Sequence, residues 1–410
     1  MSHSSSSLSL THRLWRALPA GPRRQVLASA TALLAPKPDR NPPPAAHGLA
    51  VAGEISRPSG LGEGARHILA ALAGMHTPSV ALDLGDPTVR SHERLTIPPP
   101  GMPLVIYVNA PLMPLALLRM PRRLIKGRRV IGYWAWELPT MPASWKVGLD
   151  FVHEIWVPSQ FTADAVATML PPNSDIQLRV MPNPLAISPL VCSALTRADF
   201  GMPEGAVVTL VSFNLASSFA RKNPLAAIAA HRAAFGNRPD RILLIKLTNT
   251  GFYPDDYQAL VAAAHGLDNV RFDTRTLSAA DRYALTACAD IVLSLHRSEG
   301  LGLVPAEAMM LGVPVVATGW SGTTEFMDAN SARMVDYRLV PAIDPRGVFE
   351  APNAVWAEAN IESAAAHLRE LADNADQRAA LGEAGRRMVH ARLDDRRLRA
   401  AVQEMGLPVL

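Results

Sequence analysis

The sequence has little of what marks a secreted, metal-binding or membrane-spanning protein. Its 410 residues include two cysteines, Cys192 and Cys288. These lie far apart and in no metal-ligand spacing, so neither a disulfide framework nor a zinc site is expected. No apolar run reaches the roughly 18 to 20 residues that cross a bilayer, because the best candidate, residues 104–118, is interrupted by two prolines. The Ser-rich start, residues 1–10, lacks the basic-then-apolar order of a secretory signal, and a cytoplasmic location is predicted.

The charge balance is also modest. The formal net charge is +4, and no basic run is interleaved with aromatic residues, so a nucleic-acid partner is not expected. Residues 12–34 are the local exception, since they form a basic and amphipathic stretch. This stretch either contacts an anionic bilayer at the inner face of the membrane or packs on the first domain as an ordinary helix with an exposed charged face.

Short apolar runs alternate with helix-like patterns in two successive blocks, which is typical of βαβ units and parallel sheets. The strands predicted in the first block are residues 49–53, 80–84, 104–108, 129–132, 154–157 and 178–181. Those predicted in the second block are residues 207–213, 242–247, 270–272, 291–295 and 313–317. The predicted fold class is therefore α/β, with two Rossmann-like, doubly wound domains facing each other across a cleft. Ligands of such sheets bind outside the carboxyl ends of the strands.

The domain boundaries are predicted where this rhythm starts and stops. Residues 1–45 are expected to be a disordered or basic amphipathic N-terminal segment. Residues 46–190 are expected to form the N-terminal Rossmann-like domain, 191–204 a linker, and 205–392 the C-terminal Rossmann-like domain. A final helix, 393–410, is expected to pack back on the N-terminal domain.

The most informative segment runs from residue 298 to 316 and joins a strand to a helix. Gly300 and Gly302 allow a ligand to approach the backbone closely. The helix is predicted to have Pro305 in its favoured first position, which makes Val304 the cap residue. Because Val304 has no side-chain oxygen for the free amides, the helix start is expected to bind an anion such as a diphosphate.

Two pairs of charged residues accompany this segment. Glu299 and Glu307 flank the expected anion site, where carboxylates need hydroxyl donors such as those of a sugar and a ribose. The alternative for Glu307 is a role in capping the helix. Arg221 and Lys222 stand between a strand and a helix that begins at Pro224. They either neutralise a leaving diphosphate or are an ordinary exposed basic pair.

The first block contributes a glycine-rich turn and a group of tryptophans. Gly60 and Gly62 follow the first strand. Such a turn can hold the phosphates of a ligand, among them those of a nicotinamide dinucleotide, whose fingerprint is incomplete here. Four of the seven tryptophans fall between residues 134 and 156. Tryptophan stacks well on sugar rings, so these residues either line an acceptor groove or belong to the core.

The segment from Glu299 to Glu307 resembles the Glu-x7-Glu signature of family 4, group 1 type glycosyltransferases. The Arg221–Lys222–Asn223–Pro224 sequence is similar to that family's phosphate motif. The resemblance implies the GT-B fold and a retaining, metal-independent transfer from a nucleotide diphosphate sugar. It also implies that Glu299 contacts the donor sugar, that Glu307 binds the ribose, and that the cationic pair touches the diphosphate. The sequence departs from the family where many members have a first-domain catalytic histidine, and Glu137 is predicted to stand in for it, the alternative being a solvated or salt-bridged glutamate.

These considerations give one prediction and two alternatives. The predicted catalytic residues are Glu299, Arg221, Lys222 and Glu137, and the predicted donor-binding residues are Gly60, Gly62, Arg297, Gly300, Leu301, Gly302, Leu303, Glu307 and Thr323. The predicted function is transfer of a hexose-type sugar to a carbohydrate or lipid-linked glycan in polysaccharide biosynthesis, with no metal and no cofactor besides the nucleotide-sugar donor. The alternatives are a nucleotide-sugar epimerase or hydrolase on the same fold and a non-catalytic glycosyltransferase-like subunit.

Overall fold

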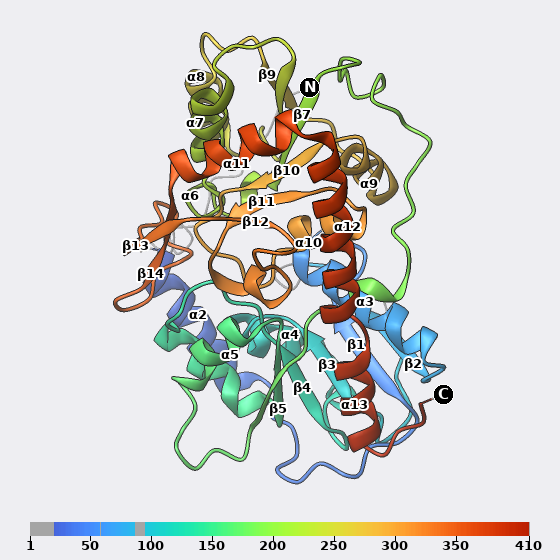
Figure 1. The fold of residues 1–410 in the computed structure, drawn as a ribbon. Helices are drawn as coiled ribbons and strands as arrows, with labels where there is room; N and C mark the ends of the chain where they lie inside the picture. The colour runs from blue at the N-terminus through green and yellow to red at the C-terminus, as the bar shows by residue number, and fades with distance from the viewer. Residues whose placement is uncertain (1–19, 58, 87–94, 410) are drawn as a thin grey trace, which may run out of the picture.

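The structure, a computed structural model, describes residues 20–57, 59–86 and 95–409. Two six-stranded sheets, one from each half of the chain, lie one below the other in Figure 1. All strand pairs in both sheets are parallel. The predicted fold class of two doubly wound α/β domains is therefore confirmed.

The first sheet has the order β2-β1-β3-β4-β5-β6. Its strands are β1 (Leu49–Gly53), β2 (Ser79–Asp83), β3 (Leu104–Tyr107), β4 (Val130–Tyr133), β5 (Glu154–Val157) and β6 (Gln177–Val180). Every residue of β1, β3, β4 and β5 is buried. This explains why these strands appear in the sequence as continuous apolar runs, since helices cover both faces of a parallel sheet.

The second sheet has the order β12-β11-β10-β7-β8-β9. Its strands are β7 (Val207–Asn214), β8 (Arg241–Thr248), β9 (Val270–Asp273), β10 (Ile291–Ser294), β11 (Val315–Thr318) and β12 (Arg333–Val335). The order reverses between β7 and β10, and crevices at such switch points are the usual ligand sites of open α/β sheets.

The helices connect these strands and close the chain. They are α2 (Ala20–Leu34), α3 (Gly60–Gly74), α4 (Met113–Arg119), α5 (Gln160–Ala167), α6 (Phe219–Lys222), α7 (Pro224–Phe235), α8 (Pro254–Ala263), α9 (Ala279–Ala287), α10 (Leu303–Met310), α11 (Ile361–Asp373), α12 (Ala375–Arg392) and α13 (Arg396–Glu404). Short 3-10 turns also occur, among them η4 (Leu185–Ile187), η5 (Leu215–Ser217) and η6 (Ser321–Glu325).

The last two helices pass from the second domain to the first, along one side of the molecule in Figure 1. Leu398, Ala401 and Val402 of α13 are buried in a cluster that contains Leu49 and Val51 of the first sheet. The chain end thus supplies part of the first domain's core.

A two-stranded antiparallel hairpin, β13 (Tyr337–Pro341) with β14 (Val355–Ala359), was not predicted from the sequence. The short edge strand β12 was also missed. Phe349 and Trp356, in and after the hairpin loop, pack in the same apolar cluster as Trp136 of the first domain. The hairpin therefore bridges the two domains.

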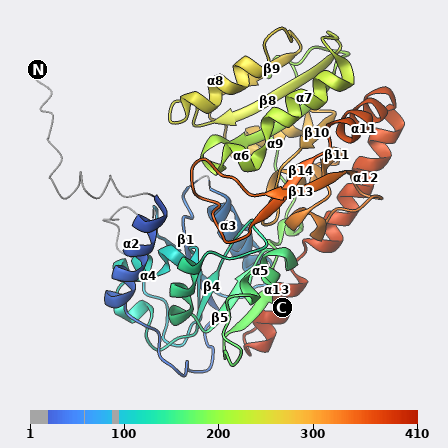
Figure 2. The ribbon, with the colours of Figure 1, turned by 90° about the vertical axis from the view of Figure 1, so that its left-hand side faces the viewer.

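Residues 12–34 are only partly described, since residues 12–19 lie outside the described residues. Helix α2 lies beside α4 at one end of the first domain (Figure 2). Ala28 and Thr31 are buried there, whereas Leu33 and Leu34 are exposed. Within the described part of the chain, no helix is both long and apolar enough to cross a membrane.

Candidate functional site

The loop after β10 and the start of α10 form the centre of the site. Helix α10 begins at Leu303 with Gly302 as its cap, and no side chain bonds its first amides. The expected cap at Val304 is therefore wrong by two residues, and Pro305 is the third helical residue. The uncapped start itself is confirmed. Its free amides and the positive end of the helix favour an anionic partner.

Gly302 is required for two physical reasons. Its φ of +95° lies in the left-handed region, which glycine adopts without strain. A Cβ atom at this position would also lie 2.5 Å from the Thr323 Cγ2 atom. Thr323 therefore packs beneath the loop, and its hydroxyl donates to the Trp320 carbonyl at 3.2 Å. The predicted contact between Thr323 and a donor gains no support from this placement.

A second loop, around η6, holds the first loop in position. The Glu299 amide donates to the Ser321 Oγ atom at 2.9 Å. The Gly322 amide donates to the Glu299 carbonyl at 2.9 Å. A Cβ atom on Gly322 would lie 2.1 Å from the Gly300 carbonyl oxygen, so only glycine fits there. Ser159 of the first domain completes the support, since its hydroxyl donates to the same carbonyl at 2.6 Å.

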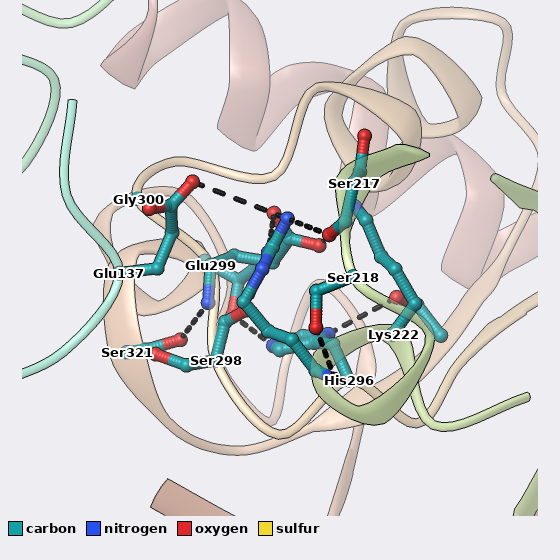
Figure 3. A network of polar contacts seen from close by, with 12 residues as sticks. Glu137, Ser217, Ser218, Lys222, His296, Ser298, Glu299, Gly300 and Ser321 are labelled. Carbon is teal, nitrogen blue, oxygen red and sulfur yellow. Dashed lines mark hydrogen bonds and ion pairs between the residues drawn. The ribbon is translucent and has the colours of Figure 1, made fainter. Parts of the chain in front are cut away.

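Glu299 pairs with both predicted cations, and Figure 3 shows the network of polar contacts around it. The Lys222 ammonium donates to one carboxylate oxygen, and the Arg221 Nη1 atom lies 3.1 Å from the other. Burial alone raises the pKa of Glu299, but the charges of Lys222 and Arg221 outweigh burial and lower it to about 2. Glu299 is therefore ionised at neutral pH and can accept hydrogen bonds from hydroxyl groups.

Arg221 and Lys222 occupy different environments. Arg221 is 4% exposed, and its guanidinium donates to the Ser298 carbonyl at 2.8 Å and to the Ser217 carbonyl at 2.9 Å. Arg221 thus ties the loop after β7 to the loop after β10. The Lys222 side chain remains 19% exposed, and its ion pair is with Glu299. Burial lowers the Lys222 pKa and Glu299 opposes that effect.

Glu137 reaches this cluster from the first domain (Figure 3). Its Oε1 atom lies 4.0 Å from the Arg221 Nη2 atom, and its side chain is 21% exposed. The loop that carries it is fixed by Trp136, whose indole N–H donates to the Thr140 carbonyl at 2.8 Å and whose carbonyl accepts from the Thr162 hydroxyl at 2.9 Å. Burial raises the pKa of Glu137, although Arg221 opposes this effect.

Glu307 lies one helical turn into α10 and is 5% exposed. Its Oε2 atom is 3.6 Å from the Arg282 Nη1 atom. Burial raises the pKa of Glu307 to about 7, with Arg282 opposing the rise and Glu63 adding to it. Glu307 is the fifth residue of α10, beyond the third position that a capping box uses, and its carboxylate pairs with Arg282 instead. The interpretation of Glu307 as a capping residue is therefore wrong.

The glycine turn of the first domain begins α3. Ser59 caps this helix by accepting a hydrogen bond from the Gly62 amide at 3.0 Å. A Cβ atom on Gly62 would lie 2.3 Å from the Glu54 carbonyl oxygen, so the turn itself requires this glycine. Gly60 is different: apart from its chain neighbours and the backbone of its own helix, no atom of the described residues lies within 4 Å of the position of its missing Cβ. Of the two predicted glycines, Gly60 is therefore the one beside which there is space for a ligand.

Some predicted residues are not brought to the cluster. The Arg297 guanidinium pairs with Glu358 at 2.7 Å and donates to the Ala220 carbonyl at 2.6 Å. Arg297 lines a cavity of about 310 Å³ beside α6 and α7. Of the two leucines predicted at the loop, Leu301 is buried in the second domain's core and Leu303 packs against it.

The four clustered tryptophans do not form an exposed stacking surface. Trp134, Trp136, Trp145 and Trp156 are between 0% and 4% exposed. Trp134, Trp136 and Trp145 pack together with ring centroids 5.1 to 6.2 Å apart. The prediction that they line an acceptor groove is therefore wrong, and they belong to the core.

Sequence reasoning missed three residues that shape the site: Ser159, Arg282 and Phe349. The Phe349 ring lies 5.5 Å from the Trp136 ring and 5.1 Å from the Arg221 guanidinium. Ser159 had a detectable signal, since a serine directly before α5 is a typical helix cap. Arg282 and Phe349 stand in a helix and a loop without motifs, and only the tertiary contacts reveal them. Among the described residues, no group of three or more His, Cys, Asp or Glu is arranged to hold a metal ion.

Comparisons with known proteins match part of the chain to a known family. Residues 220–357, which include the Lys222 and Glu299 cluster, match the family model described as "Glycosyl transferases group 1". The chain is 29% identical over 144 residues to D-inositol 3-phosphate glycosyltransferase from Arthrobacter sp. (strain FB24). That match covers 34% of this chain and 33% of the relative, so it spans about a third of the relative's length.

Solved structures resemble almost the whole chain in fold. The Anabaena protein HepE, in complex with UDP and glucose, has a TM-score of 0.59 at 13% identity, covering 88% of this chain and 99% of HepE. Sucrose-phosphate synthase from Thermosynechococcus elongatus has a TM-score of 0.59 at 16% identity, covering 87% and 97%. A glycosyltransferase from Rickettsia africae has a TM-score of 0.60 at 14% identity, covering 88% and 99%. At these identities the likeness shows a shared fold.

Proposed function

We propose that this chain, whose residues 220–357 match the group 1 glycosyl transferases, transfers a hexose-type sugar from a nucleoside diphosphate to a carbohydrate or lipid-linked glycan. The transfer is proposed to retain the anomeric configuration and to need no metal ion. The observation that carries the proposal is the ionised Glu299, held by Lys222 and Arg221, next to the uncapped start of α10. A site with an anion-binding helix start, two cations and a hydroxyl-accepting carboxylate fits a sugar diphosphate.

In the proposed reaction, the diphosphate lies at the start of α10 and the sugar hydroxyls donate to Glu299. The bond between the anomeric carbon and the diphosphate oxygen breaks, and a bond from the acceptor oxygen forms on the same face. The acceptor hydroxyl loses its proton to the departing diphosphate. Lys222 offsets the negative charge that develops on the leaving group, which is the largest contribution such a site can make.

Glu137 is proposed to act from the first domain. It approaches the same cluster, with its carboxylate 4.0 Å from Arg221. Since burial raises its pKa, a larger share of Glu137 is protonated than of an exposed glutamate. A partly buried carboxyl group at this place can bind a hydroxyl of the donor sugar or of the acceptor and orient it for attack.

The proposal is tested by a thermal-shift panel of nucleoside diphosphates and their sugars. A ligand that binds the folded state raises the melting temperature by mass action. We expect one nucleoside class to stabilise the protein, with and without EDTA. Product analysis with donor alone then separates the alternatives. A released free sugar or an altered nucleotide sugar indicates a hydrolase or epimerase, and binding without turnover for any acceptor indicates a non-catalytic subunit.

A membrane contact is proposed for residues 12–34. In the described part of this segment, Leu33 is 87% exposed and Leu34 is 73% exposed, although Ala28 packs inward. Apolar residues on a basic, surface-lying helix bind the headgroup region of anionic bilayers. Co-sedimentation with vesicles containing phosphatidylglycerol tests this proposal, and we expect Leu33→Ser combined with Leu34→Ser to reduce the bound fraction. Equal binding to neutral phosphatidylcholine vesicles would contradict it.

A further inference from the structure

A second ionic cluster joins the two domains, apart from the one around Glu299. Arg282 on α9 lies between Glu307 of α10 and Glu63 of α3. Its Nη1 atom is 3.6 Å from the Glu307 Oε2 atom, and its Nη2 atom is 3.7 Å from the Glu63 Oε1 atom. The Tyr283 hydroxyl donates to the same Glu63 oxygen at 3.3 Å. Since Glu63 stands in the first turn of α3, the cluster ties the glycine turn of the first domain to the second domain.

Further titratable groups surround the cluster: Arg66 and His67 on α3, Asp281 on α9, and Lys246 of β8, whose pKa the charge of Arg282 helps to lower. Arg66 forms an ion pair with Glu63. His67 is largely buried, and burial lowers its pKa. Helix α10 has no charged residue besides Glu307, and the neighbouring β10, β11 and η4 have none. Helix α12 approaches α10 through Gly385, which packs against Met309.

The two ends of the proposed donor site are built alike. At the sugar end, Arg221 stands between Glu299 and the first-domain residue Glu137. At the opposite end, an arginine again stands between a glutamate of the second domain and one of the first. Neither the sequence pattern nor the role proposed for Glu307 explains why a buried carboxylate should share its arginine with the other domain.

We propose that Arg282 is a positioning residue that couples nucleoside binding at Glu307 to closure of the first domain through Glu63. The inference rests on the proposed function, together with the ribose contact that the family resemblance implies for Glu307. Arg282 keeps the Glu307 carboxylate charged and directed toward the nucleoside, while its other nitrogen holds the turn that contains Glu63. Binding of a nucleoside and closure of the domain then stabilise each other, as linkage requires.

The charges around Glu307 determine the direction in which each variant should shift the pH dependence of nucleoside binding. Burial raises the pKa of Glu307 to about 7, Arg282 opposes that rise, and Glu63 adds to it. The ribose hydroxyls need the ionised carboxylate as acceptor, so affinity falls as the pH falls through this pKa. Replacing Arg282 by a neutral residue raises the Glu307 pKa, so the loss of affinity occurs at higher pH. Replacing Glu63 by a neutral residue lowers the Glu307 pKa, so the loss of affinity occurs at lower pH.

The experiment is isothermal titration of UDP and of GDP from pH 5.5 to pH 9 with the full chain. In Arg282→Gln we expect binding roughly fivefold weaker than wild type at pH 7 and within about twofold of it at pH 9. Arg282→Lys keeps the positive charge and is expected to retain most of the wild-type profile. The exposed Arg386, paired with Glu383 on α12, provides the matched control Arg386→Gln, for which we expect no change in the profile.

Glu63→Gln tests the link between the domains. Because Glu63 belongs to the other domain, a shift of the binding profile to lower pH requires that the two domains be close in solution. An unchanged profile in Glu63→Gln, or in Arg282→Gln, would overturn the inference while leaving the proposed function intact. If the wild-type chain binds neither UDP nor GDP nor any nucleotide sugar, the proposed function fails, and this inference fails with it.

Discussion

At the scale of single residues, the adjacent cations Arg221 and Lys222 look equivalent in the sequence but make different contacts in the structure. Arg221 is inaccessible and bonds two backbone carbonyls, whereas Lys222 is partly exposed and bonds Glu299. The sequence placed both residues next to the predicted phosphate site. It could not separate them, because which of the two points inward depends on how α6 lies against the loops that contain Ser217 and Ser298.

Replacing the two cations should therefore have different consequences. In Lys222→Ala we expect the transfer rate to fall about 10² to 10³-fold with little change in melting temperature. In Arg221→Ala we expect the protein to lose about 3 to 5 kcal/mol of stability, since Glu299 then loses a buried partner and two carbonyls lose their donor. Transfer assays and thermal denaturation measure the two effects. The exposed Lys146 offers the control Lys146→Ala, and a Lys222→Ala variant with full activity would remove Lys222 from the mechanism.

At the scale of elements, the hairpin of β13 and β14 brings a loop of the second domain over the cationic pair. Asp344 fixes this loop by accepting from the Val348 amide at 2.9 Å and from the Phe349 amide at 3.1 Å. The Phe349 ring is then held between Trp136 and the Arg221 guanidinium. Sequence periodicity predicted the helices and strands around this loop but not its position, because an irregular insertion has no repeating pattern that shows what it contacts.

Phe349 is expected to keep water away from the donor. In Phe349→Ala, a gap opens between Trp136 and Arg221, so water gains access to the anomeric carbon. We predict that release of free sugar from the donor without acceptor rises several-fold, while the donor still binds. Quantifying free sugar and nucleoside diphosphate measures this partition, and Phe349→Leu, which keeps an apolar side chain, should stay near wild type. An unchanged ratio of hydrolysis to transfer in Phe349→Ala would show that the ring only packs.

At the scale of the whole molecule, the fold could be predicted because each βα unit has a local sequence pattern, an apolar run followed by a helix start. The buried strands β1 and β10 are apolar runs, and helices begin at Pro224 and Pro254 as expected. The pairing of the two domains could not be predicted. Contacts such as Glu63 with Arg282, 219 positions apart in the chain, leave no mark in local spacing. The tryptophans show the same limit. A tryptophan such as Trp136 is a residue type that stacks on sugar rings, but Trp136 is buried in the core.

Among these contacts, those between α13 near the chain end and β1 of the first domain join residues that lie far apart in the sequence. Leu398 is 1% exposed and Val402 is fully buried, and both pack with Leu49 of β1. We predict that Leu398→Ala destabilises the protein by about 2 to 5 kcal/mol, as judged by urea denaturation followed through tryptophan fluorescence. The loss should appear in the first domain, because the fully buried Trp156 belongs to the same cluster. Arg387→Ala, on the exposed face of α12, is the matched control. If Leu398→Ala unfolds at the wild-type urea concentration, α13 is not part of the first domain's core and the two domains are joined less tightly than these contacts indicate.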